Sequence, residues 1–473
     1  MWGFYSVEVC VLSVSTALES LYRCLDEAFP PLPGTRIFDV PFALNDAFDP
    51  LLWCTHQPQW PQFYWQQRSG DEELAALGAV QIFASLEQAH AFLRQQGRED
   101  LRICGLNAFH PQQGLLILPR LEWRRLGGSA TLRLVLYSET SLRDDARAAR
   151  EFLDSLVAKQ AQATAMPSLL SEQHFPAYPQ WRELIAQATQ AIAAGEMDKV
   201  VLARATDLHF AAPLNAGAIM AASRRSNLNC FHFLMVFNAQ EAFMGSTPER
   251  LWRRRGALLR TEALAGTVAS HADDRQAQRL GNWLMADDKN QRENMLVVED
   301  ICQRMQGETR ALEVLPPQIV RLRKVQHLRR CIWAELEKPD DARCLHQLQP
   351  TAAVAGLPRR VALDFITRNE LFTRGWYAGS AGYLSLAQSE FCVSLRSAKI
   401  EQRTLRLYAG AGSSAVPTRS RSGRKLKIKP RDCVRYCCQK YRENDAYQNG
   451  NSLLYLYLAS IFDTGQIHVC KRI

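Results

Sequence analysis

Hydrophobic and polar residues alternate in two neighbouring stretches of the first third of the chain. The stretches "GLLILPRLEWRR" (114–125) and "ATLRLVLYS" (130–138) are rich in Leu, Ile and Val, and Gly127 and Gly128 stand between them. Apolar runs separated by a Gly-Gly pair are typical of a β-hairpin. The pattern therefore predicts two antiparallel strands joined by a tight turn.

Helices are predicted where apolar residues recur every three or four positions. This spacing marks residues 86–96 and 141–159, and Ser141 stands where a helix N-cap is expected. The same spacing marks 181–194, where Gly195 would end the helix before a β-branched strand, "KVVLARATDLHF". The second part of the chain thus begins with a helix followed by a strand.

The remaining pattern mixes helices with hairpins. One long helix is predicted over 273–306, with runs of strands before it and over 382–412. There is no GxGxxG, no P-loop and no strict alternation of strand and helix, so we predict a mixed α/β (α+β) fold rather than a Rossmann fold. The arginines of "WRRRG" (252–256) are expected at a solvated strand edge.

Residues 161–180, rich in Ala, Gln, Ser and Pro, are the best linker candidate. They would separate an N-terminal portion, 11–160, from a second portion, 181–412. The opening "MWGFYSVEVC" has no basic leader, and "LLYLYLASIF" (453–462) is shorter than the roughly 20 residues that span a bilayer. The 13 Cys residues show no CxxC or paired Cys/His spacing. We therefore expect reduced thiols, no zinc and a soluble, cytoplasmic protein.

Positive charge is concentrated at the end of the chain. The formal net charge is +9, but residues 413–473 hold 12 of the 57 Lys and Arg residues and only four of the 48 Asp and Glu residues. Residues 1–412 are therefore nearly neutral, within a chain of ordinary globular composition, 47% hydrophobic and 22% charged. This distribution argues against nucleic-acid binding by the body of the protein.

Eight motifs in a fixed order resemble the chorismate-utilising enzymes: anthranilate synthase component I, aminodeoxychorismate synthase, salicylate synthase and isochorismate synthase. The motifs are "GEMDKVVLAR", "MGSTPERLW", "TEALAGT", "DDKNQRENMLVVEDI", "KVQHLRR", "LHQLQPTAAVAGLPR", "WYAGSAGYLS" and "FCVSLRSAKI". The resemblance is greatest to the menaquinone-pathway isochorismate synthases of enteric bacteria and covers roughly residues 11–412. It implies two facing, largely antiparallel sheets flanked by helices, magnesium as cofactor and chorismate as substrate.

The implied reaction adds water at C2 of chorismate and expels the C4 hydroxyl, so it needs a base and an acid. The resemblance makes Lys199 the general base that activates water and Glu249 the general acid. A lysine acts as a base only where burial or positive charge lowers its pKa, and a carboxyl as an acid where it is poorly solvated. Taken alone, Lys199 could be a solvated lysine, and Glu249 a turn residue paired with Arg250.

The resemblance also implies a metal ligand and a substrate-binding set. Glu293 would be a Mg²⁺ ligand, since Mg²⁺ commonly takes one or two protein carboxylates; alone, it could be a surface glutamate of a charged helix. His327 is expected near the ring-binding region. The residues expected to hold the substrate are Gly266, Thr267, Tyr377, Arg396, Gly410 and Gly412.

After "AGAG" (409–412) the family continues with an acidic segment resembling DPExEWxExxxK, whose helix supplies a second magnesium carboxylate. This chain instead reads "PTRSRSGRKLKIKPRDC" (417–433). Legitimate codons for this stretch, beginning CCG ACC CGG AGC AGG AGT, encode DPEQEWQEIENKAAGL when reading starts two bases later. We hypothesise that a frameshift just after Gly412 produced residues 413–473, and that the second ligand, expected near Arg424, is lost.

These features leave alternatives for the tail and for the activity. Residues 413–473 are expected to be an aberrant, disordered basic tail that impairs activity; an RNA- or DNA-binding arm and a membrane-surface tail are the competing interpretations. Residues 1–10 are expected to be upstream sequence. The alternative functions are a siderophore-pathway isochorismate synthase and a non-catalytic chorismate-binding protein. The sequence does not disclose the oligomeric state.

Overall fold

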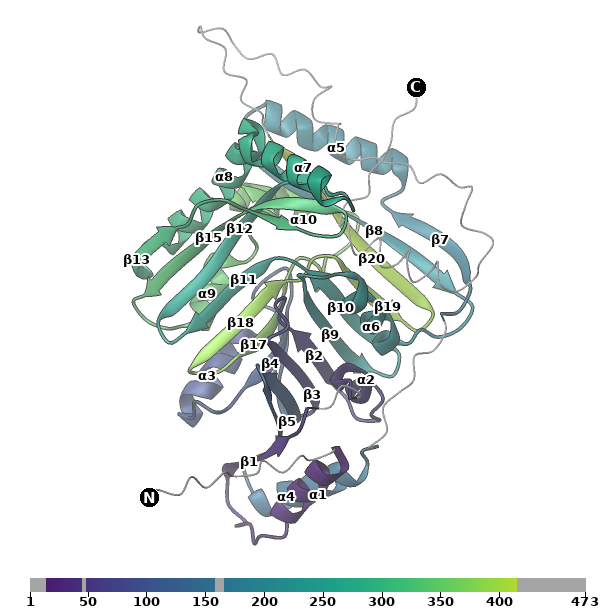
Figure 1. Cartoon of the computed structure of the whole chain (residues 1–473), viewed down its shortest axis with the longest axis vertical. Helices are drawn as coiled ribbons and strands as arrows, with labels where there is room; N and C mark the ends of the chain where they lie inside the picture. Colours follow the sequence, from purple (N-terminus) through teal and green to yellow (C-terminus); the bar gives the residue numbers. More distant parts are fainter. Residues whose placement is uncertain (1–13, 45–47, 158–165, 415–473) are drawn as a thin grey trace, which may run out of the picture.

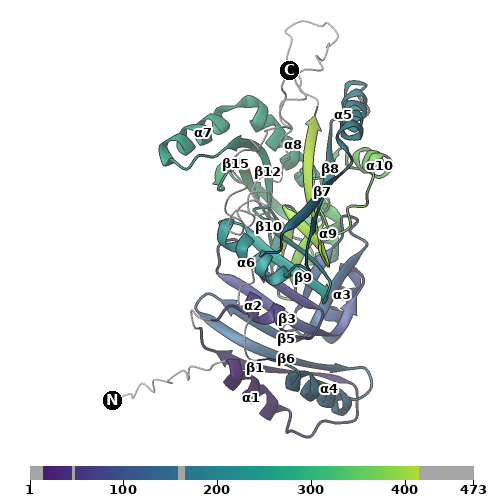
Figure 2. The ribbon, with the colours of Figure 1, turned by 90° about the vertical axis from the view of Figure 1, so that its right-hand side faces the viewer.

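A computed structural model describes residues 14–44, 48–157 and 166–414 (Figures 1 and 2). The helices are α1 (Val14–Cys24), α2 (Pro50–Thr55), α3 (Leu86–Gln96), α4 (Leu142–Asp154), α5 (Tyr178–Ala193), α6 (Ala216–Ser226), α7 (Asp274–Ala286), α8 (Asp288–Met305), α9 (Asp341–Leu348) and α10 (Arg359–Asn369). The strands are β1 (Gly34–Phe42), β2 (Gln62–Gln66), β3 (Glu72–Phe83), β4 (Ile103–Asn107), β5 (Gly114–Leu126), β6 (Ser129–Ser138), β7 (Leu169–Phe175), β8 (Lys199–Phe210), β9 (Phe231–Asn238), β10 (Glu241–Thr247), β11 (Arg250–Arg255), β12 (Leu258–Ala269), β13 (Thr309–Val314), β14 (Gln318–Arg321), β15 (Val325–Leu336), β16 (Gly356–Leu357), β17 (Ser380–Leu384), β18 (Gln388–Val393), β19 (Ser397–Glu401) and β20 (Thr404–Ser414).

The strands form two arms that diverge from β5. The first arm runs in the order β1, β6, β5, β3, β2, β9, β10, β19, β20 and β8, with β7 and β16 also paired to β8. The second arm runs from β5 through β4, β17, β18, β11, β12 and β15, with β13 and β14 also paired to β15. Every strand pairing within the described ranges is antiparallel.

The largest core lies between the two arms. One cluster of buried residues contains Phe63 and Val200 from the first arm together with Trp252 and Ile332 from the second. Helices pack against the strands: α1 contacts β1 and β6, α4 contacts β6, α2 contacts β2 and β3, α6 contacts β9 and β10, and α7 and α8 contact β12 and β15 (Figure 1). The predicted mixed α/β fold with two facing antiparallel sheets is confirmed.

The local sequence signals act where they were predicted. Strands β5 and β6 form a hairpin that turns at Gly127, whose φ of 57° suits glycine. The Ser141 side chain caps α4 by accepting a hydrogen bond from the Asp144 N–H at 3.3 Å. Helix α5 stops just before Gly195, which has a φ of 77°. Short-range signals therefore define these boundaries well.

The single long helix predicted over 273–306 is wrong. Helix α7 ends at Ala286, α8 begins at Asp288, and Asp287 between them has an extended backbone. Its side chain accepts the Asn290 N–H at 2.9 Å and caps α8. Because an Asp side chain that bonds nearby N–H groups competes with helix continuation, the chain turns here. The break gives α8 its own direction beside β12 and β15.

The ranges predicted for linker and tail differ from the structure in part. Within 161–180, residues 169–175 form β7, an exposed strand that pairs with β8, and α5 begins at Tyr178. Six of its seven residues are exposed, so the segment lacks the alternation of buried and exposed positions that signals a strand. Strand β20 continues through Ser414 and so includes the first two residues of the predicted tail; the rest of the tail and residues 1–10 lie outside the described residues.

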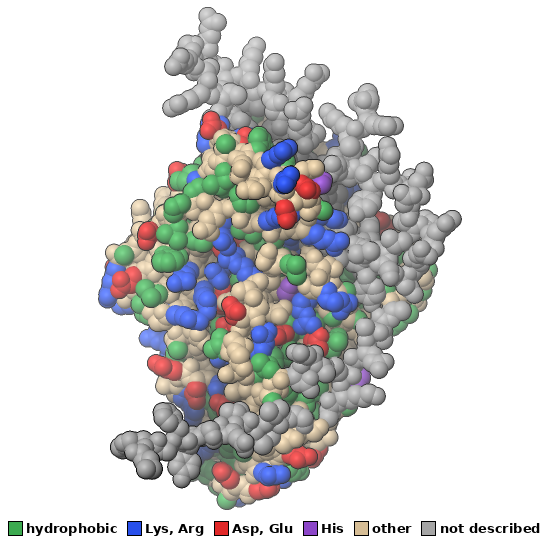
Figure 3. Space-filling model, in the orientation of Figure 1, with side chains coloured by type: hydrophobic (Ala, Val, Ile, Leu, Met, Phe, Trp, Pro, Cys, Tyr) green, Lys and Arg blue, Asp and Glu red, His purple; other side chains and the backbone are tan. Residues whose placement is uncertain are grey.

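The surface carries both signs of charge. On the face drawn in Figure 3, Lys and Arg side chains lie over the middle of the molecule with Asp and Glu side chains between them. Among the helices that the structure describes, none is long and apolar enough to cross a bilayer.

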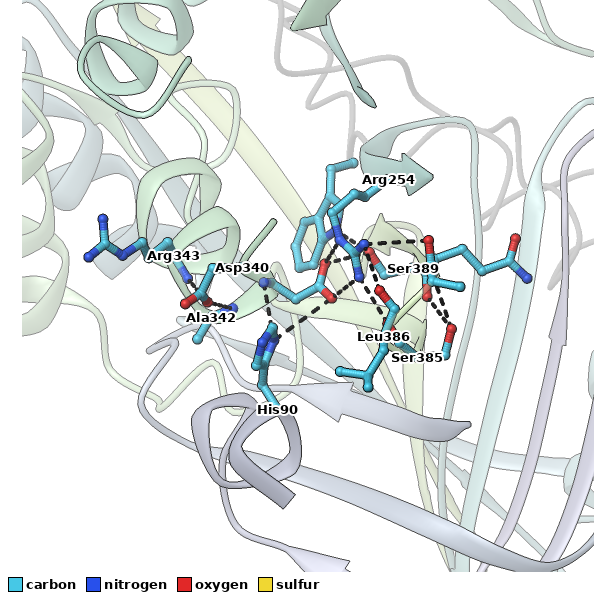
Figure 4. A network of polar contacts seen from close by, with 12 residues as sticks. His90, Arg254, Asp340, Ala342, Arg343, Ser385, Leu386 and Ser389 are labelled. Atoms are coloured by element: carbon cyan, nitrogen blue, oxygen red, sulfur yellow. Dashed lines mark hydrogen bonds and ion pairs between the residues drawn. The ribbon is translucent and has the colours of Figure 1, made fainter. Parts of the chain in front are cut away.

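Arg254 corrects the expectation of a solvated edge at 252–256. Its side chain is only 1% exposed, and its Nε and Nη2 donate to Asp341 at 2.9 and 2.6 Å (Figure 4). The Ser389 hydroxyl donates to Asp341 at 2.5 Å, and His90 Nδ1 lies 3.9 Å from the same carboxylate. This network joins α3, α9, β11 and β18, which are far apart in sequence. The local sequence pattern therefore could not predict that Arg254 is buried.

Asp341→Ala is expected to lower the free energy of unfolding by about 3–5 kcal/mol, because it leaves the Arg254 charge buried without its carboxylate. Urea unfolding followed by circular dichroism measures the loss. Asp100→Ala is the control: it removes an ion pair with Arg98 whose side chains are 45% and 37% exposed, and should cost less than about 1 kcal/mol. Equal losses in the two variants would contradict the prediction.

Candidate active site

One cavity of about 180 Å³ gathers the predicted site residues. Its lining comes from β8, β12, β15, β20 and α8 and from the segments before β11, β16, β17 and β19. All nine predicted residues line it, and so does His327: Lys199, Glu249, Gly266, Thr267, Glu293, Tyr377, Arg396, Gly410 and Gly412. The structure thus brings them together, while their chemical roles remain predictions.

Lys199 is the first residue of β8, between the neighbouring strands β16 and β20. It pairs with Leu357 on one side and with Ser414 on the other. Its side chain is 4% exposed, and its Nζ lies 3.9 Å from Glu293 Oε1. A side chain this buried does not fit the alternative of a solvated lysine. The amine is held at the cavity wall, where it can reach a bound molecule.

Glu249 lies in the turn between β10 and β11 and is buried. Burial and then the nearby Glu262 carboxylate raise the pKa of Glu249 to about 8, although Lys199 acts in the opposite direction. A carboxyl with this pKa keeps its proton at neutral pH and can act as a general acid. Arg250 pairs with Glu390 and not with Glu249.

Glu293 lies on α8 and brings the second carboxylate into the cavity. Its side chain is 35% exposed, whereas Val297, one turn further along, is buried. No three His, Cys, Asp or Glu residues in the described ranges lie close enough together to hold an ion by themselves. A single carboxylate oxygen suits an ion such as Mg²⁺, which takes its remaining ligands from water and substrate.

A bulge in β12 directs Thr267 at the cavity. The register between β12 and β15 shifts between Leu264 and Thr267, and Thr267 lies opposite His327. Gly266 has a φ of 86°, and a Cβ there would lie 3.2 Å from the Cβ of Asn290 on α8. Glycine is therefore needed both for the backbone conformation and for the close approach of α8.

A chain of three polar groups orients the Thr267 hydroxyl. Burial and then Arg396 lower the pKa of His327 to about 3, so its ring is neutral. Arg396 Nη2 lies 3.1 Å from His327 Nε2, and Thr267 Oγ1 lies 2.9 Å from His327 Nδ1. A guanidinium only donates, so Nε2 accepts and Nδ1 carries the proton. Thr267 Oγ1 then accepts this proton, which leaves its own hydrogen for an oxygen in the cavity.

Two stacked tyrosines form another part of the wall. The rings of Tyr377 and Tyr408 lie 5.0 Å apart and 8° from parallel. Burial raises the pKa of Tyr377 to about 12, so its hydroxyl remains a hydrogen-bond donor. A Cβ at Gly410 would lie 2.9 Å from that hydroxyl oxygen, so glycine keeps the space beside it open. This flat wall with one polar end suits a ring that carries oxygen substituents.

Sequence reasoning missed some residues around the site. Tyr408 directly precedes "AGAG", and this position next to a recognised motif was the signal that could have identified it. Glu262 stands within "TEALAGT" and influences Glu249. Arg68 contacts Glu262 from the N-terminal portion, and no local pattern signals that contact.

Comparison with known proteins gives consistent matches. A family model described as chorismate binding enzyme matches residues 106–424. The chain is 66% identical over 401 residues to isochorismate synthase MenF of Escherichia coli K12. The matched region covers 85% of this chain and 93% of that protein. It is 38% identical over 370 residues to isochorismate synthase MenF of Haemophilus influenzae, covering 78% of this chain and 84% of that protein.

Solved structures show the same likeness. The structure of MenF, the menaquinone-specific isochorismate synthase from Escherichia coli, matches with a TM-score of 0.84 and 66% identity, over 85% of this chain and 94% of that one. Anthranilate synthase component I from Streptococcus pneumoniae matches with a TM-score of 0.57 and 17% identity, over 87% of this chain and 95% of that one. The second match is a likeness of fold alone.

Proposed function

The chain belongs to the family of chorismate-binding enzymes, and from this premise we propose that its cavity converts chorismate to isochorismate through Lys199, Glu249 and a magnesium ion. The activity and its place in menaquinone biosynthesis follow from the 66% identity to a menaquinone-specific isochorismate synthase. The observation that carries the assignment of roles is the placement of a buried amine and a buried, protonated carboxyl on one cavity.

The two groups divide the proton transfers between them. Lys199 Nζ takes a proton from water as the water oxygen bonds to C2 of chorismate. The ring double bonds shift, the C4–oxygen bond breaks, and Glu249 gives its proton to the departing hydroxyl, which leaves as water. One water enters and one leaves, so the product is an isomer of the substrate. General acid–base catalysis of this kind contributes typically 10²–10⁴-fold to a rate.

The cavity supplies one of the two carboxylates expected to bind Mg²⁺. Isochorismate synthases depend on a metal ion, and Glu293 supplies the hard oxygen ligand that Mg²⁺ prefers. When bound, the ion would offset the charge of a substrate carboxylate beside Glu293. The second protein ligand is expected near Arg424, outside the described residues, and an arginine cannot ligate a cation. We therefore propose that turnover by this chain is impaired.

The rest of the cavity orients the substrate. The guanidinium of Arg396 can hold a carboxylate, and the Thr267 hydroxyl donates to a substrate oxygen because its own lone pair already accepts from His327. Arg396 has a φ of 48°, which is unusual for a residue with a side chain and is found where a function requires a particular direction. Binding can therefore persist where turnover is slow. For this reason a non-catalytic chorismate-binding protein is the second candidate.

The test is an isotope experiment with chorismate and Mg²⁺ in H₂¹⁸O. Isochorismate should form with one ¹⁸O in its C2 hydroxyl, which mass spectrometry locates, and the chain of 473 residues should form it slowly. Added ammonium salts should give no amino product, and no pyruvate should appear. An amino product or pyruvate would point to a different reaction. Chorismate binding without any product, even after an acidic segment is restored, would favour the second candidate.

A further inference from the structure

A residue of the N-terminal portion reaches the turn that carries Glu249. Arg68 lies between β2 and β3, and its Nη1 donates to the Pro248 carbonyl at 2.8 Å. The same guanidinium donates twice to Glu262 on β12, at 2.6 and 2.8 Å. Arg68 thus connects the peptide group just before Glu249 with a carboxylate of another strand.

Glu262 holds the other side of the same turn. Its Oε1 accepts the Arg250 N–H at 2.8 Å, directly after Glu249. The Glu249 carbonyl in turn accepts the Val393 N–H at 3.1 Å. Hydrogen bonds therefore fix the backbone before, at and after Glu249. A turn held at three successive points keeps the backbone of Glu249 in a fixed place beside the cavity.

The pair also places a lasting negative charge near the Glu249 carboxyl. The Glu262 side chain is 1% exposed. Burial acts to raise its pKa, but Arg68 and then Arg250 outweigh burial and lower it, so Glu262 is ionised. Its charge raises the pKa of Glu249, which Lys199 opposes.

The other charged or titratable groups that line the same cavity are Glu293, His327, Arg396, Tyr377 and Tyr408. His327 is neutral, and burial keeps both tyrosines protonated. Glu262 therefore raises the pKa of the Glu249 carboxyl and Lys199 lowers it, while burial adds to the effect of Glu262.

We propose that Arg68 and Glu262 are positioning residues for the reaction: the pair fixes the turn that carries Glu249 and holds a carboxylate near the Glu249 side chain. The proposal rests on the proposed role of Glu249 as general acid. It assigns a part in the chemistry to the N-terminal portion, whose described residues do not line the cavity. Arg68 and Glu262 act through Glu249 and need not touch the substrate.

The test follows the infrared carbonyl band of the protonated Glu249 carboxyl in the full chain, assigned by its loss in Glu249→Gln. In the parent protein the band should disappear as pH rises through about 8. In Glu262→Gln the midpoint should fall by about one pH unit or more, because the repelling charge is gone. Arg68→Met should shift it in the same direction, because Glu262 then takes up a proton and adds a second carbonyl band.

Glu122→Gln is the matched control. Glu122 is a buried glutamate paired with Arg102, with 2% of its side chain exposed, and it does not line the cavity. This variant should keep the parent midpoint although it too loses a buried ion pair. An unchanged midpoint in a folded Glu262→Gln or Arg68→Met protein would overturn the proposal. Failure of the proposed function would give a separate result. In that case Glu249→Gln would keep its turnover, while the Glu262→Gln and Arg68→Met variants would still show their infrared shifts.

Discussion

Replacing residues 417–432 with DPEQEWQEIENKAAGL is expected to raise the rate of isochorismate formation by at least about 100-fold. The replacement supplies an acidic helix with a second carboxylate for the metal, where the chain has Arg424. Loss of groups that merely support a metal ligand costs typically 10–100-fold, so restoring a ligand itself should gain no less. Initial rates with saturating Mg²⁺ and chorismate measure the difference.

A matched segment, DPEQEWQQIENKAAGL, separates the ligand from the rest of the helix. It differs only in the carboxylate at position 424 and should leave the rate near that of the chain of 473 residues. The Mg²⁺ concentration for half-maximal rate should fall only with the acidic version. If the chain of 473 residues already works as fast as the restored chain, the tail does not impair the enzyme and the frameshift interpretation loses its functional support.

Lys199→Ala and Glu249→Gln are each expected to lower kcat by about 10²–10⁴-fold in the restored chain. Each removes one proton transfer from the cavity, while Arg396, Thr267 and Tyr377 remain to bind chorismate. Substrate affinity, measured by calorimetry with each variant, should therefore change much less than kcat. A Lys199 variant that kept its turnover would exclude this amine as the base.

The pH profile gives an independent reading of Glu249. The folded protein holds the pKa of this carboxyl at about 8, above its ordinary value. The protonated carboxyl that can act as the acid is therefore present below that pH and ionises above it. Because kcat/KM reports the pKa values of the unliganded enzyme, it should fall as pH rises through about 8. The Glu262→Gln variant should show the same fall at lower pH.

The motifs located the cavity well because they carry their own local geometry. Lys199 begins a β-branched strand after a glycine stop, and Gly266 with Thr267 belongs to a bulged strand end. Each of these is set by neighbours in sequence. The resemblance then placed segments from 199 to 412 in one site, which spacing alone does not do. Likewise the hairpin at Gly127 and the cap at Ser141 are encoded within a few residues.

What the sequence did not reveal depends on contacts between distant segments. Arg254 stands among three arginines, and nothing beside it indicates that it is the one buried against Asp341. Arg68 and Glu262 are 194 positions apart. The helix break at Asp287 has a local cause, the capping side chain. Helical spacing of apolar residues continues on both sides of Asp287, however, so the pattern predicted one helix where the structure has two.

Strands β2 and β4 of the N-terminal portion pair with β9 and β17 of the second portion. A fragment beginning at residue 181 would therefore expose the flanks of β9 and β17, with rows of N–H and C=O groups that have lost their neighbours. Such open flanks recruit other chains and promote self-association. Truncation to the segment that contains the cavity would accordingly give insoluble material. The two portions therefore have to be expressed and engineered together as one chain.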